Sequence, residues 1–137
     1  MKNKTLCILS CTSKKFDGEM EARLLYAKSN FFKKCKLFCQ KNNYNYVIIS
    51  ALYGLIEPKT IIQNYDKALK NKKDIKKIQN DVIEKLQLLL PNYDKIIVLC
   101  GQKYIETFKP LINKNFQFPM KGMSIGHRLQ WLGEQIK

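Results

Sequence analysis

The segment TLCILS, Thr5–Ser10, is a short apolar run that ends in small polar residues. A run of this kind is typical of a strand that is buried on both faces of a sheet. Two later segments repeat the pattern, YVIIS at Tyr46–Ser50 and KIIVLC at Lys95–Cys100, and a loop follows each. Because helical segments separate the three runs, we expect them to be parallel strands of one sheet.

Helical periodicity fills most of the chain between these runs. The pattern from Asp74 to Leu90 is the strongest, with apolar residues on one face and Pro91 at its end. Ser29-Asn30 is expected to cap a second helical segment inside the first helical stretch. We expect helices at about 19–41, 74–90, 103–109 (ended by Pro110) and 124–136, a loop at 51–58, an ambiguous segment at 61–69 and a short extra strand at 116–119.

The alternation of strands and helices predicts an α/β fold. We expect a three-layer sandwich with a small, mainly parallel sheet of three to four strands. The 137 residues suit one domain, and no linker or repeat divides residues 1–137. In such sheets ligands bind beyond the carboxyl ends of the strands. The loops after Ser10, Ser50 and Cys100 are therefore the expected place of a site.

The chain is strongly basic, with a formal net charge of +14. Only Arg23 and Arg128 are arginines among the 25 basic residues, although arginine is the residue that pairs best with phosphate. A net charge of this size attracts polyanions. Composition thus leaves two interpretations open, contact with nucleotides or nucleic acid and a merely solvated lysine surface.

Five cysteines, an odd number, favour reduced thiols over a disulfide framework. Cys7/Cys11 and Cys35/Cys39 have a spacing that suggests metal ligands, but one pair flanks the end of a strand and the other falls on a helix. We therefore expect no metal site and no cofactor. No apolar run approaches the length of a membrane span, and the amino terminus does not read as a signal peptide, so we expect a cytoplasmic protein without a membrane partner.

The loop after the first strand combines small hydroxyl and thiol side chains with two lysines, Lys14 and Lys15. Backbone amides, hydroxyls and lysines that converge at strand ends can bind a phosphate or a polar base. Cys11 next to these lysines is a possible nucleophile, and Asp66 a possible general acid/base. The alternatives are a small buried thiol at Cys11, a helix-capping carboxylate at Asp66 and a surface histidine at His127.

Several motifs together resemble an uncharacterised family of small bacterial and phage domains. They are Ser10-Cys11-x-x-x-Lys15, Arg23-x-x-Tyr26, Ser50-Ala51-x-Tyr53-Gly54-Leu55-x-x-Pro58, Tyr65-Asp66, Gly101-x-x-Tyr104 and Gly122-x-x-x-Gly126-x-x-Leu129-x-Trp131-Leu132. The Ser50–Pro58 stretch also resembles the peroxide-stress YaaA family, whose members are linked to DNA binding and protection from oxidative damage. The Cys11–Lys15 loop is similar to the loop of archaeosine synthase in which a lysine attacks a modified deazaguanine base in tRNA.

We therefore expect an enzyme or enzyme-like domain that acts on a nucleobase, nucleotide or nucleic acid, by base modification or N-glycosidic chemistry. The alternative is a non-catalytic DNA- or RNA-binding protein of the stress-response kind. Lys15 is expected to be a solvated loop residue. Tyr53 and Asp66 are expected to face the same cavity as Ser10 and Lys15. The candidate catalytic residues are Lys15, Asp66 and Cys11, and the candidate binding residues are Ser10, Ser13, Lys14, Arg23, Ser50, Tyr53, Gly54, Tyr65, Gly101, Tyr104, Gly126 and His127.

Overall fold

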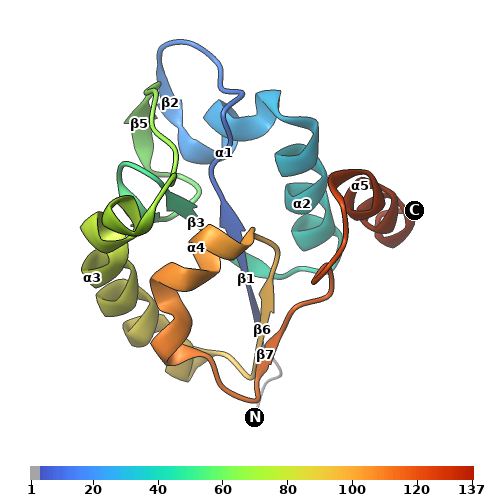
Figure 1. The fold of residues 1–137 in the computed structure, drawn as a ribbon. Coiled ribbons are helices and arrows are strands. Elements are labelled where there is room, and N and C mark those ends of the chain that lie inside the picture. Colours follow the sequence, from blue (N-terminus) through green and yellow to red (C-terminus); the bar gives the residue numbers. More distant parts are fainter. Residues whose placement is uncertain (1–3) are drawn as a thin grey trace.

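The computed structural model describes residues 4–137, and these form an α/β sandwich (Figure 1). Its main sheet has five strands, one more than the largest number expected, and a second sheet has two. Within residues 4–137, no helix has the length and apolar character needed to cross a membrane. The elements in chain order are β1 (Thr5–Ser10), β2 (Glu19–Glu21), α1 (Ala22–Leu25), α2 (Asn30–Lys41), β3 (Asn45–Ser50), β4 (Gly54–Ile56), β5 (Ile61–Gln63), α3 (Lys72–Leu89), β6 (Lys95–Val98), α4 (Gln102–Ile105), β7 (Phe116–Gln117) and α5 (Ile125–Gln135).

The main sheet has the strand order β4-β3-β1-β6-β7. β1 lies at the centre and runs parallel to β3 and β6, while only the edge strand β4 is antiparallel. Figure 1 shows α2 and α5 on one side of this sheet and α3 and α4 on the other. The chain thus leaves β1 for β3 over one face and returns to β6 over the other. A reversal of this kind opens a crevice beside the central strand, where ligands of doubly wound sheets bind.

The central strands are almost entirely buried, as strands covered on both faces should be. Leu6–Leu9 and Ile96–Leu99 are each at most 5% exposed. Trp131 is half-buried and its ring lies 5.6 Å from that of Phe38. Each long helix buries one apolar stripe against the sheet: Phe32, Cys35, Phe38 and Cys39 on α2, and Ile78, Val82 and Leu86 on α3.

The helix expected over 19–41 is interrupted. Residues 19–21 form β2, which pairs with β5, and a short helix and a 3₁₀ turn follow before α2 begins. Gly18 has a φ of 93°, a left-handed conformation that turns the chain into β2. The expected cap at Ser29 is confirmed, since its Oγ accepts a hydrogen bond of 3.2 Å from the Phe32 amide.

The predicted loop 51–58 contains strand β4, which pairs with β3 through a tight turn at Gly54. The ambiguous segment 61–69 contains β5. The last helix before β7 is shorter than expected, because α4 ends at Ile105 and a 3₁₀ turn, Glu106–Leu111, continues through Pro110. Proline fits a short 3₁₀ turn because its fixed φ suits it and the missing N–H costs little there.

Candidate functional site

The thiol of Cys11 contacts the loops that follow the parallel strands β3 and β6, and Cys11 itself follows β1. Cys11, directly after β1, accepts a hydrogen bond of 3.3 Å from the Ala51 amide in the loop after β3. The same sulfur lies 3.2 Å from the hydroxyl of Tyr104, which follows β6. Cys11 itself is 7% exposed. The structure therefore brings the three loops together, with Cys11 as a buried tie between them.

A group of side chains that contact one another through hydrogen bonds or aromatic rings lies at the ends of β1 and β3; this tyrosine cluster comprises Lys15, Tyr26, Ser50, Tyr53 and Tyr65. The Tyr65 hydroxyl lies 2.6 Å from that of Tyr26 and 2.8 Å from Ser50 Oγ. The rings of Tyr53 and Tyr65 meet edge to face at 5.5 Å. Burial raises the pKa of Tyr65 far above 10, so its hydroxyl is protonated and can donate within the cluster.

Lys15 is not the solvated loop residue that the sequence suggested, since it is only 8% exposed. Its amine donates to the carbonyl oxygens of Thr12 and Ser13, at 3.0 and 3.5 Å, and lies 4.6 Å from the centroid of the Tyr65 ring. No carboxylate of residues 4–137 forms an ion pair with it. The protein's own atoms therefore occupy the positions around the amine that a ligand would need.

The β2–β5 ladder explains why Lys15 is buried although its neighbours in the loop are exposed. β2 follows this loop and β5 precedes Tyr65, so their pairing holds the two segments against each other. Asn64 adds bonds from its backbone amide to the Gly18 carbonyl and from its side chain to the Phe16 carbonyl. The contact between the Lys15 loop and the segment before Tyr65 joins residues that are far apart in the sequence, so no local sequence pattern predicts it.

Asp66 is exposed, and none of the hydrogen bonds or ion pairs found in residues 4–137 involves it. Its neighbour Tyr65 is the residue that enters the cluster. Arg23 lies outside the tyrosine cluster and forms an ion pair of 2.7 Å with Glu21. It lines a hollow of about 520 Å³ beside the amino ends of β1 and β3.

Gly54 is needed for the fold rather than free for a ligand. Its φ is 76°, and a Cβ at this position would lie 2.1 Å from a carboxylate oxygen of Asp81. Ser13, Lys14, Gly126 and His127 are all exposed. Ser10 is half-buried at the end of β1, and Gly101 forms the cap of α4.

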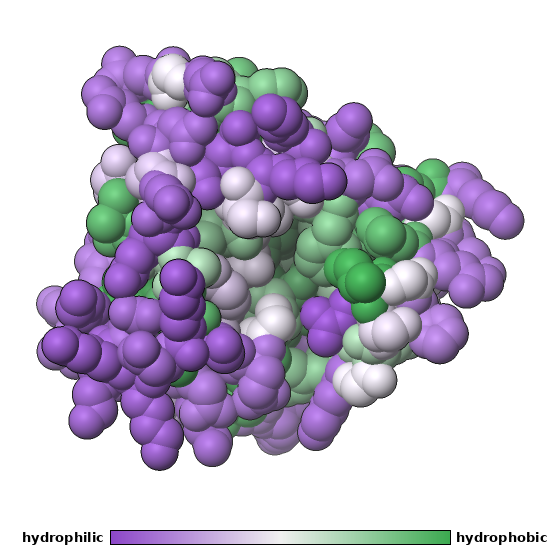
Figure 2. Space-filling model, turned by 45° about the horizontal axis from the view of Figure 1, so that its top comes forward, coloured by the Kyte–Doolittle hydropathy of each residue, from purple (hydrophilic) through white to green (hydrophobic). Residues whose placement is uncertain are grey.

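A hollow of about 430 Å³ opens at the carboxyl end of β6, where Val98 and Cys100 line it. In Figure 2, where the top of Figure 1 is turned forward, the centre of the molecule is hollowed and shows pale and apolar surface inside a hydrophilic surround. The volume falls within the usual range for small-molecule sites. We call this space the β6 hollow; it is lined by Val98, Cys100, Gln102, Ile105, Glu106, Lys109, Ile112, Phe118, Met120, Lys121, Gly122 and Arg128.

The β6 hollow combines apolar walls with three cationic side chains and one carboxylate, that of Glu106. Arg128 is held in place by a bond of 3.0 Å from its Nε to the Met123 carbonyl. Glu106 Oε2 accepts a bond of 2.8 Å from the Gln102 side chain. Burial raises the pKa of Cys100 to about 12, so this thiol is protonated near neutral pH and is a poor nucleophile.

The cysteines are free and buried, and none is placed for metal binding within the described residues. Cys35 and Cys39 lie on the buried face of α2. A side-chain hydrogen bond with Cys7, followed by burial, raises the pKa of Cys39. These thiols therefore act as small apolar side chains of the core.

Sequence reasoning missed most of the β6 hollow. Its charged residues Glu106, Lys109 and Lys121 belong to no motif. Two signals pointed toward it: Gly122 belongs to a motif, and Arg128, one of only two arginines, lies within the same motif. The residues chosen there instead, Gly126 and His127, lie on the exposed side of the first turn of α5.

A family of unknown function, DUF6884, matches the chain over residues 6–134. The chain belongs to this family. The match includes the three parallel strands, the tyrosine cluster and every residue of the β6 hollow. No curated protein matches the sequence. The family is thus uncharacterised, as the motifs indicated, and it assigns no activity.

Proposed function

We propose that this protein is an enzyme or enzyme-like domain that binds a nucleobase, nucleotide or nucleic acid in the β6 hollow. The reaction would be base modification or cleavage of an N-glycosidic bond. One observation carries the proposal: a hollow of about 430 Å³ at the carboxyl edge of the sheet combines apolar walls, three cations and one carboxylate. A base can pack against the apolar walls, a phosphate can bind the cations, and the carboxylate can exchange a proton with the substrate.

Each part of the β6 hollow has a role in this proposal. Phe118 and Met120 supply apolar surface for a planar base. Lys109, Lys121 and Arg128 supply positive charge for phosphate, and the fixed guanidinium of Arg128 offers a planar fork. Glu106 is the group that would take or give a proton during the reaction.

The residues first considered for catalysis have supporting roles in the proposal. Lys15 and Cys11 position the loops around the site, because their polar atoms contact the protein itself. The acid/base role considered for Asp66 passes to Glu106, the carboxylate that lines the hollow. The free thiols favour a cytoplasmic setting, which is also part of the proposal.

The test is calorimetric titration of the protein with free bases and mononucleotides, together with mass spectrometry of bases and nucleotides incubated with it. We expect binding of at least one mononucleotide, and Lys121→Ala should weaken it about tenfold because one phosphate contact is lost. Lys114→Ala is the matched control, since Lys114 is an exposed lysine that does not line the hollow. Equal affinities for the two variants would refute the β6 hollow as the binding site.

A second candidate function is non-catalytic DNA or RNA binding of the stress-response kind. Exposed lysines at the start of α3 favour it, and the resemblance of the Ser50–Pro58 stretch to the YaaA family belongs to this candidate. The two candidates differ in turnover. Binding of nucleic acid without any chemical change in mass spectrometry would favour the second candidate over the first.

A further inference from the structure

Six exposed lysines lie on neighbouring segments, one of which, α4, also lines the β6 hollow. They come from the segment before α3, from the first two turns of α3 and from α4, which are near one another because the Lys103 amine donates to the Lys70 carbonyl at 3.3 Å. We call this surface the lysine ridge; it consists of Lys70, Lys72, Lys73, Lys76, Lys77 and Lys103.

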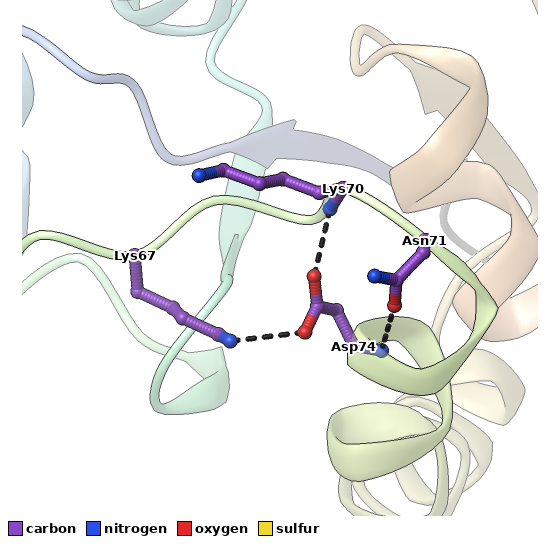
Figure 3. A network of polar contacts seen from close by, with 4 residues as sticks. All are labelled: Lys67, Lys70, Asn71 and Asp74. Atoms are coloured by element: carbon purple, nitrogen blue, oxygen red, sulfur yellow. Dashed lines mark hydrogen bonds and ion pairs between the residues drawn. The ribbon is translucent and has the colours of Figure 1, made fainter.

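The single acidic residue between positions 67 and 80 does not neutralise the ridge. Asp74 is 9% exposed, and Figure 3 shows its carboxylate between the Lys67 amine and the Lys70 backbone, with the Lys70 side chain directed away. The two contacts measure 2.9 and 3.0 Å. The bond from the Lys70 amide, followed by that from Lys67, lowers the pKa of Asp74 to about 2. The negative charge is therefore committed to Lys67 and to the start of α3.

The ridge and the hollow share a helix. α4 contributes Lys103 to the ridge and contributes Gln102 and Ile105 to the lining of the β6 hollow. A chain-like ligand that followed the ridge would thus meet the hollow at α4. Binding of a free mononucleotide in the hollow would not require the additional lysines of the ridge.

We propose that the substrate is a single nucleic-acid strand, whose phosphates lie along the lysine ridge while one base enters the β6 hollow. This inference rests on the proposed function and narrows its substrate class. A single strand fits because a base in a duplex is stacked and must be extruded before a pocket can receive it. Phosphate contacts by several lysines supply affinity without sequence preference.

The composition of the ridge argues against an anionic membrane surface as the partner. Proteins that lie on membranes insert large apolar side chains between their basic residues. Among the described residues, the exposed large apolar side chains include none between positions 62 and 87. The ridge therefore offers charge without an apolar anchor, as a phosphate backbone requires.

The experiment compares two triple variants of equal charge. One carries Lys72→Ala, Lys73→Ala and Lys76→Ala on the ridge, and the control carries Lys33→Ala, Lys59→Ala and Lys114→Ala, three exposed lysines outside it. Fluorescence anisotropy is measured with single-stranded DNA and RNA of about ten nucleotides, a usual site size for such proteins. Mononucleotide binding and binding to phosphatidylserine vesicles are measured in parallel.

The ridge variant should bind the oligonucleotide about tenfold more weakly than the control, and the slope of log affinity against log salt should fall by about 2. Mononucleotide affinity should be the same in both variants, whereas Lys121→Ala should weaken mononucleotide and oligonucleotide alike. Equal oligonucleotide losses in the two triple variants would overturn the inference and leave the proposed function standing. So would a loss confined to vesicles. If the wild type bound neither mononucleotides nor oligonucleotides, the proposed function itself would fail.

Discussion

The tyrosine cluster and the β6 hollow lie at the ends of different parallel strands of one sheet, yet one is filled and the other is open. In the cluster the Lys15 amine is surrounded by two carbonyls and an aromatic ring. In the hollow, Lys109 and Lys121 are exposed and border empty space. A lysine can thus be bound by protein atoms or be free to bind a ligand, depending on the groups around it. The residue type alone does not distinguish the two cases.

The difference arises from the segments that follow each strand. Beyond β1 and β3, the β2–β5 ladder folds over the strand ends and presses the Lys15 loop against Tyr65. Beyond β6, the chain enters the short helix α4. Between α4 and the segment 118–122 a volume of about 430 Å³ is not filled by side chains. A second small sheet therefore closes one half of the crevice, and the other half stays open.

The largest effect is expected at Gly54, at the turn that leads into β4 beside the cluster. Gly54→Ala combines a left-handed φ of 76° with a Cβ only 2.1 Å from Asp81 Oδ2. We expect a loss of about 3 kcal/mol or more in the free energy of unfolding, measured by urea denaturation.

Gly18→Ala is the control for that variant. Gly18 has a φ of 93° but open space around its Cβ position. Only the conformational cost of about 1 kcal/mol remains. Equal losses in the two variants would show that the Asp81 side chain moves away from the added methyl group. The turn before β4 would then be loosely packed, in contrast to the tyrosine cluster beside it.

A middle-sized effect is expected at Lys15. Lys15→Ala removes a buried stem, two bonds to carbonyls and the contact with the Tyr65 ring. We expect the free energy of unfolding to fall by about 2 kcal/mol, with mononucleotide affinity in the hollow unchanged. The neighbouring exposed residue provides the control, because Lys14→Ala should change stability by less than about 0.5 kcal/mol. Unchanged stability with lost turnover would instead restore a catalytic role for Lys15.

The sequence was sufficient for the parts of this molecule that depend on local pattern. The three buried strands, the cap at Ser29 and the long helix near 74–90 are encoded by short-range apolar spacing and side-chain chemistry. The loops that carry Cys11, Ser50 and Tyr104 were also expected to meet at one edge of the sheet, because parallel strands carry their loops to the same side, and the contacts of Cys11 join them there.

Other parts depend on contacts between distant segments and were not predictable in the same way. β2 and β5 have three residues each, too short for a periodic pattern, and they are strands only because they pair with each other. That pairing buries Lys15 and selects Tyr65 rather than Asp66 for the cluster. The β6 hollow is an absence of atoms between α4, segment 118–122 and Arg128, and no residue pattern encodes an empty space.

The smallest effect on stability is expected at Glu106, where the open half of the crevice is tested directly. Glu106 is half-buried, and its hydrogen bond to the Gln102 amide can be kept by the amide oxygen of glutamine. Glu106→Gln should therefore change the free energy of unfolding by less than about 0.5 kcal/mol and leave mononucleotide affinity nearly unchanged. Turnover should fall about a hundredfold or more, because glutamine cannot exchange a proton with the substrate. Glu84→Gln, at an exposed position of α3, is the matched control and should keep full turnover. Turnover that survived Glu106→Gln would exclude this carboxylate as the acid/base group, and the β6 hollow would then serve binding alone.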